Sequence, residues 1–566
     1  MSRKESVICS TGALVVGLAL MSLPAFGGKK YIAFGWEFDK IGPEDLLRKI
    51  AEYDASPLDG VGVFYTMTDE SGRPCGARTI METGPWTQAS AEANVPVLRE
   101  LARHRSMRAS MLTSFRHPVK RIPWTDEAAW ARVATNLERV AYMASASGLN
   151  GLYADQEDYE KQGQFVLRDE DGDDFEALSA LARRRGAQLF GPVFAHCPKA
   201  RLFVMRFFCA DPGFWNGYYG SHDPVATMRM KGDLWPSFAN GILDVLPSGA
   251  TIVEGDEHGY RYDAGRRDYL LAYNQIHARL LPLVAPENRT KYRAQVRASS
   301  AIYLDGLADG KPGGTYYQGA ADEPRMHYVE KTLHQAAWTT DEFVWFWGEK
   351  HPWIDWGKTR INPSVRKGEP WETVLPGLDG MLRANSDPLG YMRGRLAEMR
   401  ADGTYTNLLA GVRLEDYPTW QAGPPRKKHL RATRLGTFGV TDGMLWSEGC
   451  ESGCYTVPVE NLEPGTWYAV RLEARGRRTY ADVRFKKDGR WRNLLPGVSL
   501  LPSGPVRDGW QLFETLVRIP EGANELNIVF SSREGVGERS WYRDVEVVPV
   551  PFVAKVKSTV KQGTSK

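Results

Sequence analysis

Residues 149–159 read LNGLYADQEDY, and this stretch does most to decide the fold. Its first part is typical of a buried β-strand, and carboxylates follow at its end, at Asp155, Glu157 and Asp158. Residues 250–262, ATIVEGDEHGYRY, have the same pattern. The acids that end this second run are Glu254, Asp256 and Glu257.

Acids that follow strands can be read in two ways. Asp and Glu often stand there only because they form turns and cap helices. Two such clusters, in a chain with 18 Trp, instead favour chemistry at the carboxyl ends of barrel strands, where side chains of different strands meet.

Between residues 30 and 403 the chain alternates strand-like and helix-like segments. Eight short β-branched or aromatic runs separated by helical spacing predict an α/β fold, a (β/α)₈ TIM barrel over residues 28–403. A doubly wound open sheet is the alternative, but the first strand runs into GWEFDKIG and not into a glycine-rich phosphate loop. The expected strands are Tyr31–Phe38, Val61–Met67, Met107–Phe115, Leu149–Asp155, Arg201–Cys209, Ala250–Asp256, Arg293–Asp305 and Glu342–Trp347.

The ends of these strands supply the candidate site. Residues two apart on a strand point to one side, so Asp155 and Glu157 can both face the barrel mouth, as can Glu254 and Asp256. Cleavage of a glycosidic bond needs one carboxylic acid and one carboxylate, and like charges held close raise one pKa. We therefore expect a catalytic pair with one member from each couple, and Asp305 as a reserve acid. The expected substrate-binding residues are Trp36, Glu37, Tyr65, Arg116, His117, Arg206, Tyr303, Trp347 and Glu349, the last also a reserve acid.

NGLYADQE, residues 150–157, resembles the strand-four signature of chitinase-type glycosidases, DG-x-x-x-D-x-E, whose last Glu is the acid. Gly151, Asp155 and Glu157 match this pattern. Asn150 stands where Asp is usual, and residue 153 is Tyr where the pattern has an acid or an amide.

The general layout also resembles barrel glycosidases that use an Asp after strand four and another acid after strand six. This resemblance implies that Asp155 is the nucleophile and that Asp256 or Glu254 is the acid/base. The residues leave retention or inversion of configuration open.

Other activities stay open on the same scaffold. A polysaccharide lyase needs a Tyr, His or Lys base beside an Arg, and Arg116, His117 and Tyr303 keep that possible. A non-catalytic carbohydrate-binding protein is a further alternative. A metal-dependent hydrolase of another class ranks last, because only His117 and His258 lie near strand ends.

Residues 404–552 contain short strands and turns, which predict an all-β sandwich. TNLLAGVRLEDYPTWQ, TWYAVRLEARG and SWYRDVEVVPV resemble segments of the jelly-roll carbohydrate-binding modules found beside secreted glycosidases. The resemblance implies a jelly-roll fold. Tyr542-Arg543-Asp544 replaces the usual double acid, so neither calcium nor ligand binding is carried over.

The two ends of the chain are expected to lie outside both domains. Residues 1–27 combine Arg3, Lys4, an apolar run and small residues before position 28, the pattern of a signal peptide. We therefore expect a secreted or periplasmic protein with no membrane contact after cleavage. The basic, polar residues 553–566 are expected to be disordered.

Composition limits the partners. A net charge of +3 with both signs mixed gives no reason to expect nucleic acid, so a carbohydrate substrate is the expected partner. No Cys/His spacing indicates a metal site, and no cofactor is expected. Cys450 and Cys454 form either a local disulfide or two free thiols. The oligomeric state is open.

Overall fold

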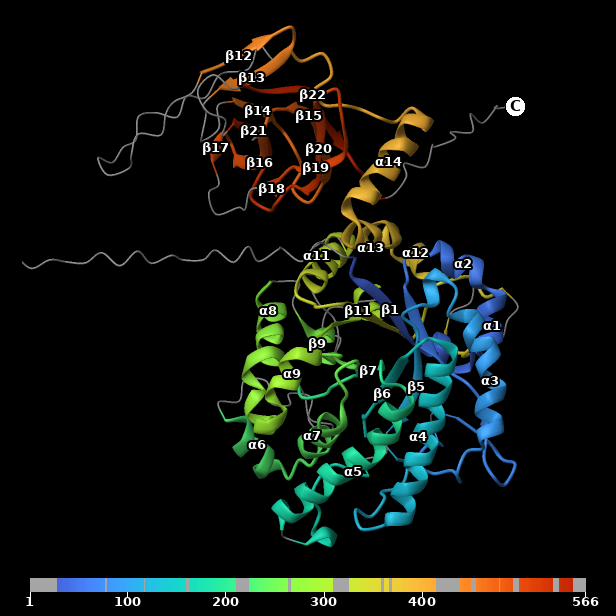
Figure 1. Cartoon of the computed structure of the whole chain (residues 1–566). Helices are drawn as coiled ribbons and strands as arrows, with labels where there is room; N and C mark the ends of the chain where they lie inside the picture. The colour runs from blue at the N-terminus through green and yellow to red at the C-terminus, as the bar shows by residue number, and fades with distance from the viewer. Residues whose placement is uncertain are drawn as a thin grey trace, which may run out of the picture.

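The computed structural model presents two bodies of structure, an N-terminal α/β part and a C-terminal part of antiparallel strands (Figure 1). The predicted signal peptide, His117, the Cys450/Cys454 pair and the tail 553–566 lie outside the residues described. The structure describes residues 28–76, 79–116, 118–158, 162–172, 174–209, 223–262, 266–308, 325–357, 361–365, 369–413, 437–448, 455–477, 479–491, 498–532 and 539–552.

The N-terminal part is built on one parallel sheet, in the order β10-β11-β1-β2-β5-β6-β7-β8-β9. β9 and β10 stand at opposite ends of this order, although only Ser299 separates them along the chain. The sheet is therefore a nearly closed barrel. Within the described residues its strands are β1 (Lys30–Gly35), β2 (Gly60–Val63), β5 (Met111–Arg116), β6 (Gly151–Asp155), β7 (Arg201–Val204), β8 (Thr251–Glu254), β9 (Val296–Ala298), β10 (Ser300–Tyr303) and β11 (Phe343–Gly348).

The prediction of a parallel barrel with helices is confirmed in this coarser form. The expected seventh strand, Arg293–Asp305, is divided between the end of a helix, β9 and β10. Ser299 interrupts it, because both its backbone N–H and its hydroxyl donate to the carbonyl of Glu254 on β8, at 3.0 and 2.7 Å. A short two-stranded ribbon, β3 (Met67–Thr68) and β4 (Pro74–Cys75), lies outside the barrel sheet.

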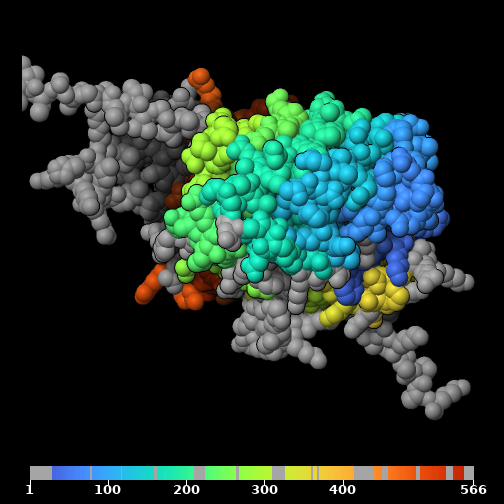
Figure 2. Space-filling view, turned by 90° about the horizontal axis from the view of Figure 1, so that it is seen from below, coloured from blue at the N-terminus to red at the C-terminus, as the bar shows by residue number. Residues whose placement is uncertain are grey.

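Helices surround the barrel sheet (Figure 1), and the α/β part of the chain forms most of the face seen in Figure 2. Their starts follow local rules: Thr87, Asp126 and Asp174 each accept the N–H three residues later. The helices are α1 (Pro43–Arg48), α2 (Ile50–Ala55), α3 (Gln88–Leu101), α4 (Glu127–Ser147), α5 (Phe175–His196), α6 (Pro224–Lys231), α7 (Trp235–Val245), α8 (Arg266–Asn274), α9 (Arg289–Gln295), α10 (Leu304–Ala308), α11 (Arg325–Trp338), α12 (Trp371–Val374), α13 (Leu378–Ser386) and α14 (Pro388–Asp402). In the described part of the chain, no helix is both long and apolar enough to cross a membrane.

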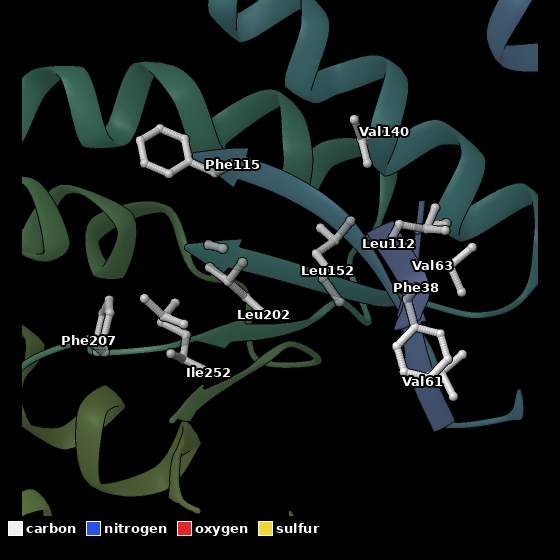
Figure 3. Close-up of a cluster of buried hydrophobic side chains, with 14 of the residues drawn as sticks. Phe38, Val61, Val63, Leu112, Phe115, Val140, Leu152, Leu202, Phe207 and Ile252 are labelled. Atoms are coloured by element: carbon white, nitrogen blue, oxygen red, sulfur yellow. The ribbon is translucent and has the colours of Figure 1, made fainter. Parts of the chain in front are cut away.

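Alternate side chains of the barrel strands enter two separate apolar clusters. On β6, Leu152 belongs to the cluster between the sheet and the helices, where Val140 of α4 also lies (Figure 3). Tyr153 instead belongs to the cluster inside the curled sheet, with Phe34 and Trp345. Because side chains alternate along a strand, Asp155 follows Tyr153 toward the inside of the barrel, where β6 ends.

The C-terminal part confirms the expected antiparallel all-β region. One sheet has the order β12-β13-β22-β15-β20-β19, the other β14-β21-β16-β17 with β18 beside β16, and an apolar core fills the space between them. The strands are β12 (Thr437–Thr441), β13 (Met444–Glu448), β14 (Tyr455–Val459), β15 (Trp467–Arg475), β16 (Thr479–Lys487), β17 (Arg490–Trp491), β18 (Val498–Ser499), β19 (Leu501–Arg507), β20 (Trp510–Arg518), β21 (Glu525–Ser532) and β22 (Arg539–Pro549).

The two parts meet through α11, α13 and α14 (Figure 1). Met392 and Leu396 of α14 pack with Trp467 and other apolar residues on the outer face of the six-stranded sheet. On α11, Glu330 accepts hydrogen bonds from Trp467 Nε1 and, at 2.9 Å, from Nε of Arg518. The predicted domain boundary at residue 403 stays a prediction.

Candidate functional site

Three carboxyl groups and two guanidinium groups meet at the carboxyl ends of neighbouring barrel strands. Arg116 ends β5, and Asp155 ends β6. Glu157 follows β6, Arg206 follows β7, and Glu257 follows β8. Asp155, Arg206 and Glu257 are buried, with exposed fractions of 5%, 2% and 6%. These five residues are referred to below as the carboxylate cluster.

Ion pairs and hydrogen bonds connect the carboxylate cluster into one unit. Arg206 pairs with both Glu157 and Glu257, and its Nε donates to Oε2 of Glu257 at 2.6 Å. Nε of Arg116 lies 3.6 Å from Oδ2 of Asp155. The backbone N–H of Glu157 donates to Oδ1 of Asp155 at 3.0 Å.

The charges of the cluster do not balance. If every group were ionised, three carboxylates would face two guanidinium groups, and one negative charge in excess would be buried. Burial raises the pKa of Asp155 to about 6, with the nearby Glu157 adding to the rise and Arg116 opposing it.

The pKa of Glu257 is raised further than that of Asp155. Burial raises its pKa to about 8, although Arg206 favours the ionised form; the charges of Glu157 and Asp155 add to the rise. Of these two acids, Glu257 therefore holds its proton to the higher pH. The adjacent His258 is neutral at neutral pH, because burial and the nearby Arg206 and Arg261 lower its pKa to about 4.

Glu254 does not join this cluster. Its carboxylate accepts the backbone N–H groups of Phe207, Phe208 and Cys209, at 2.8, 2.6 and 3.2 Å, and the thiol of Cys209 at 3.0 Å. The carboxylate thus fixes the turn that begins with Arg206. The side-chain amide of Gln156 donates to the carbonyl of Arg206 from the other side.

Asp256 also turns away from the cluster. It has a left-handed backbone, φ 48°, and both its carboxyl oxygens lie within hydrogen-bond distance of the Tyr262 hydroxyl, at 2.8 and 2.9 Å. The preceding Gly255 passes so close to β7 that a Cβ would stand 2.6 Å from the carbonyl oxygen of Met205. The strand ends at Glu254, so alternation does not extend to Asp256, and Glu257 joins Asp155 and Glu157 instead.

Two predicted substrate-binding residues make contacts within the protein. The Glu37 carboxylate accepts hydrogen bonds from Tyr53, from Nε1 of Trp356 and from the backbone of Trp353, all within 2.9 Å. Burial raises its pKa to about 7. The Tyr65 hydroxyl donates to the carbonyl of residue 113 at 2.6 Å. Trp36, beside Glu37, is half-buried against the outer apolar cluster.

Aromatic side chains continue the inner cluster toward the strand ends. Tyr303 and Trp347 are half-buried at the ends of β10 and β11, and Nε1 of Trp347 donates to Glu349 at 3.1 Å. Tyr260 lies against Tyr303, with ring centroids 5.4 Å apart. The carboxylate of Asp305 accepts the backbone N–H of Glu349 at 2.7 Å, so this reserve acid supports a loop.

The sequence prediction named Glu257 among the acids after the second run but left it out of the expected catalytic pair, and it missed Tyr260; both residues lie in one 3₁₀ turn, Glu257–Arg261. The signal that could have found them is Gly255, since a glycine between two acids indicates the end of a strand. Among the described residues, no group of three or more His, Cys, Asp and Glu side chains is arranged to hold a metal ion.

Comparison with known proteins finds no matching family model and no matching curated protein. The enzymatically active domain of bacteriophage CBA120 tailspike protein 4 is 18% identical over 19% of this chain and 15% of its own, with a TM-score of 0.16. A CBM4 structure is 21% identical over 25% of this chain and 90% of its own, with a TM-score of 0.18.

A third solved structure contains the CBM22-1 and GH10 modules of Clostridium thermocellum xylanase 10B in complex with xylohexaose. It is 9% identical over 26% of this chain and 28% of its own, with a TM-score of 0.19.

Proposed function

We propose that this protein is a glycoside hydrolase whose catalytic carboxyl groups are Asp155 and Glu257. The observation that carries the proposal is the buried carboxylate cluster at the strand ends, in which Arg206 pairs with Glu157 and Glu257 and burial raises the pKa of both Asp155 and Glu257. A glycosidase needs this combination, because one carboxylic acid must protonate the leaving oxygen while a carboxylate attacks the sugar or activates water.

The fold proposal that goes with it is an eight-stranded (β/α)₈ barrel. β9 and β10 then count as one strand that Ser299 interrupts, pairing with β8 on one side and with β11 on the other. The carboxyl ends of the strands form the mouth, where active sites of such barrels lie.

In the mechanism we propose, Glu257 is the general acid. Arg206 already donates to Oε2 of Glu257, so the guanidinium stabilises the carboxylate that forms when the proton leaves. Asp155 supplies the ionised carboxylate, either as a nucleophile or as the base for water. Glu157 completes the ion pairs of Arg206 and keeps the guanidinium in place between the two glutamates.

Tyr303 and Trp347, with the buried Tyr260 packed against Tyr303, are the proposed sugar-binding surface, since flat aromatic faces suit the apolar faces of sugar rings. The proposed substrate is a polysaccharide or oligosaccharide. The signal-peptide pattern of residues 1–27 supports action outside the cytoplasm. The C-terminal sandwich is proposed as an accessory domain.

A polysaccharide lyase is less well supported. A lyase uses an arginine to neutralise the carboxylate of a uronate, whereas Arg206 is already paired with two glutamates. Arg116 lies within ion-pair distance of Asp155. Both guanidinium groups of the cluster therefore have acidic partners within the protein.

The test is release of reducing sugar from a panel of plant and algal polysaccharides. Wild type is compared with Asp155→Asn, Glu257→Gln and a control, Glu100→Gln, on the exposed side of α3. We expect each of the first two variants to lose at least about 10³-fold in kcat/KM, and the control to match wild type. Products that absorb as unsaturated uronates would show a lyase instead, and full activity of both variants would remove these acids from the mechanism.

A further inference from the structure

The outer face of the six-stranded sheet has two halves of different character. α14 covers the half around Trp467, Ala469 and Leu516. The other half carries tryptophan and arginine side chains. We call this half the Trp–Arg face; its members are Trp446, Trp510, Trp541, Arg475, Arg539 and Arg543.

The Trp–Arg face is a continuous row across four adjacent strands. Trp446 of β13 pairs with Trp541 of β22, and Trp541 pairs with Arg475 of β15. Trp510 begins the next strand, β20, beside Arg475. With strands about 4.8 Å apart, the row is roughly 14 Å long.

Each guanidinium group of the row lies over an indole ring. Arg539 stands 4.0 Å from the ring centroid of Trp446, and Arg543 stands 4.1 Å from that of Trp510. Arg475 lies between two rings, 4.9 Å from Trp510 and 5.8 Å from Trp541. Stacking holds a guanidinium flat and leaves the N–H groups in its plane free to bind a planar or tetrahedral anion.

The charges of the row are only partly balanced. Arg543 pairs with Glu473 at 2.6 Å, and Arg539 pairs with Glu448 at 3.2 Å. Arg475 is exposed, and the described part of the chain places no carboxylate within ion-pair distance of it. The row thus presents one uncompensated cation on an aromatic platform, flanked by two cations that have partners.

We propose that the Trp–Arg face binds an anionic polysaccharide, one that carries carboxylate or sulfate groups. The half-exposed edges of Trp446 and Trp541 offer apolar contact to sugar rings, and Arg475, next to Trp541 in the row, offers paired N–H donors to the charged group. Glutamates interleaved with the arginines keep the local field weak, which disfavours a densely charged nucleic acid. This binding is independent of catalysis in the barrel.

Isothermal titration of the full-length protein tests the proposal. The ligands are polygalacturonate, dextran sulfate, neutral dextran and single-stranded DNA. We expect binding to one or both anionic glycans, weaker binding at higher salt, and no binding to neutral dextran. The two anionic ligands distinguish a carboxylate site from a sulfate site. Glu100→Gln, on the exposed side of α3, is expected to bind as wild type does.

The decisive variants are Arg475→Ala and Arg475→Glu, with Arg484→Ala as the matched control. Arg484 is an exposed strand arginine on the other sheet, 3.6 Å from Asp482. We expect the affinity of both Arg475 variants to be at least tenfold weaker than that of wild type, and the affinity of the control to be unchanged. The melting temperatures of all three variants should equal that of wild type. Equal losses for Arg475→Ala and Arg484→Ala, no binding to either anionic glycan, or equally tight binding of single-stranded DNA would each overturn the proposal.

Discussion

Arg206 donates from Nε to Oε2 of Glu257 at 2.6 Å, and both side chains are almost fully buried. The pair joins two turns, one after β7 and the other after β8, and its second partner, Glu157, follows β6. A buried guanidinium between two glutamates fixes both acids in place, and it lowers the free energy of the carboxylate that a proton donor becomes. The proposed chemistry depends on this relationship.

Replacing Arg206 tests that dependence. Arg206→Met removes the buried guanidinium group that contacts both Glu157 and Glu257, and breaking a buried ion pair costs roughly 3–5 kcal/mol of unfolding free energy. Urea unfolding at pH 7 measures the loss. Exposed ion pairs contribute less than about 1 kcal/mol. A loss of unfolding free energy below that value at pH 7 would contradict the buried network.

The pH dependence of kcat/KM should follow the two shifted acids. Activity requires Asp155 ionised, so it rises as pH increases through about 6. It also requires Glu257 protonated, so it falls as pH increases through about 8. We therefore expect a bell with its optimum between these two values in initial-rate measurements. A profile that is flat from pH 5 to 9 would contradict the assignment.

Glu254→Gln tests whether Glu254 positions Arg206 by holding the turn that follows β7. Gln keeps one acceptor oxygen but cannot satisfy all three backbone N–H groups of the turn that carries Arg206. We expect roughly a 10- to 100-fold lower kcat/KM, since small misplacements in a site cost about that much. As Arg206 moves from Glu257, the alkaline limb of the pH profile should shift upward. If the alkaline limb of the pH profile stays at its wild-type position, Glu254 stabilises the fold but does not position Arg206 for catalysis.

Glu330 provides a prediction about the junction of the two parts. Glu330→Ala leaves Trp467 Nε1 and Arg518 without their shared acceptor, which costs about 1–3 kcal/mol when the groups are buried. Calorimetry should show the sandwich unfolding earlier than in wild type. The matched control is Glu521→Ala: this residue is exposed beside Lys331, so we expect a change within about 0.5 kcal/mol. Identical scans for Glu330→Ala and wild type would contradict a stabilising role.

Much of the barrel could be predicted from the sequence because its signals are local. Strand-like runs ended near the correct residues where an apolar core lies on both sides, as in β6, and helix starts carried their capping side chains, as at Asp126 and Asp174. Strand ends were less predictable. The expected strand Arg201–Cys209 stops at Val204, because the carboxylate of Glu254 captures the backbone of the following residues.

The site was predictable only in part, for the same reason. Asp155 lies where alternation along β6 places it. Beyond Glu254 the alternation fails, since the close approach of Gly255 to β7 and the left-handed Asp256 redirect the chain. The contact between Gly255 and the end of β7 therefore decides which of residues 254, 256 and 257 lies beside Asp155. The sequence pattern of a single strand does not reveal such a contact.

The most direct test of the central claim separates proton donation from the rest of catalysis. Glu257→Gln is assayed on a polysaccharide and on an activated aryl glycoside, whose leaving group departs without protonation. We predict a loss of at least about 10³-fold on the polysaccharide and less than about 10-fold for cleavage of the aryl glycoside bond. Equal losses on both substrates, or no loss on either, would contradict Glu257 as the general acid.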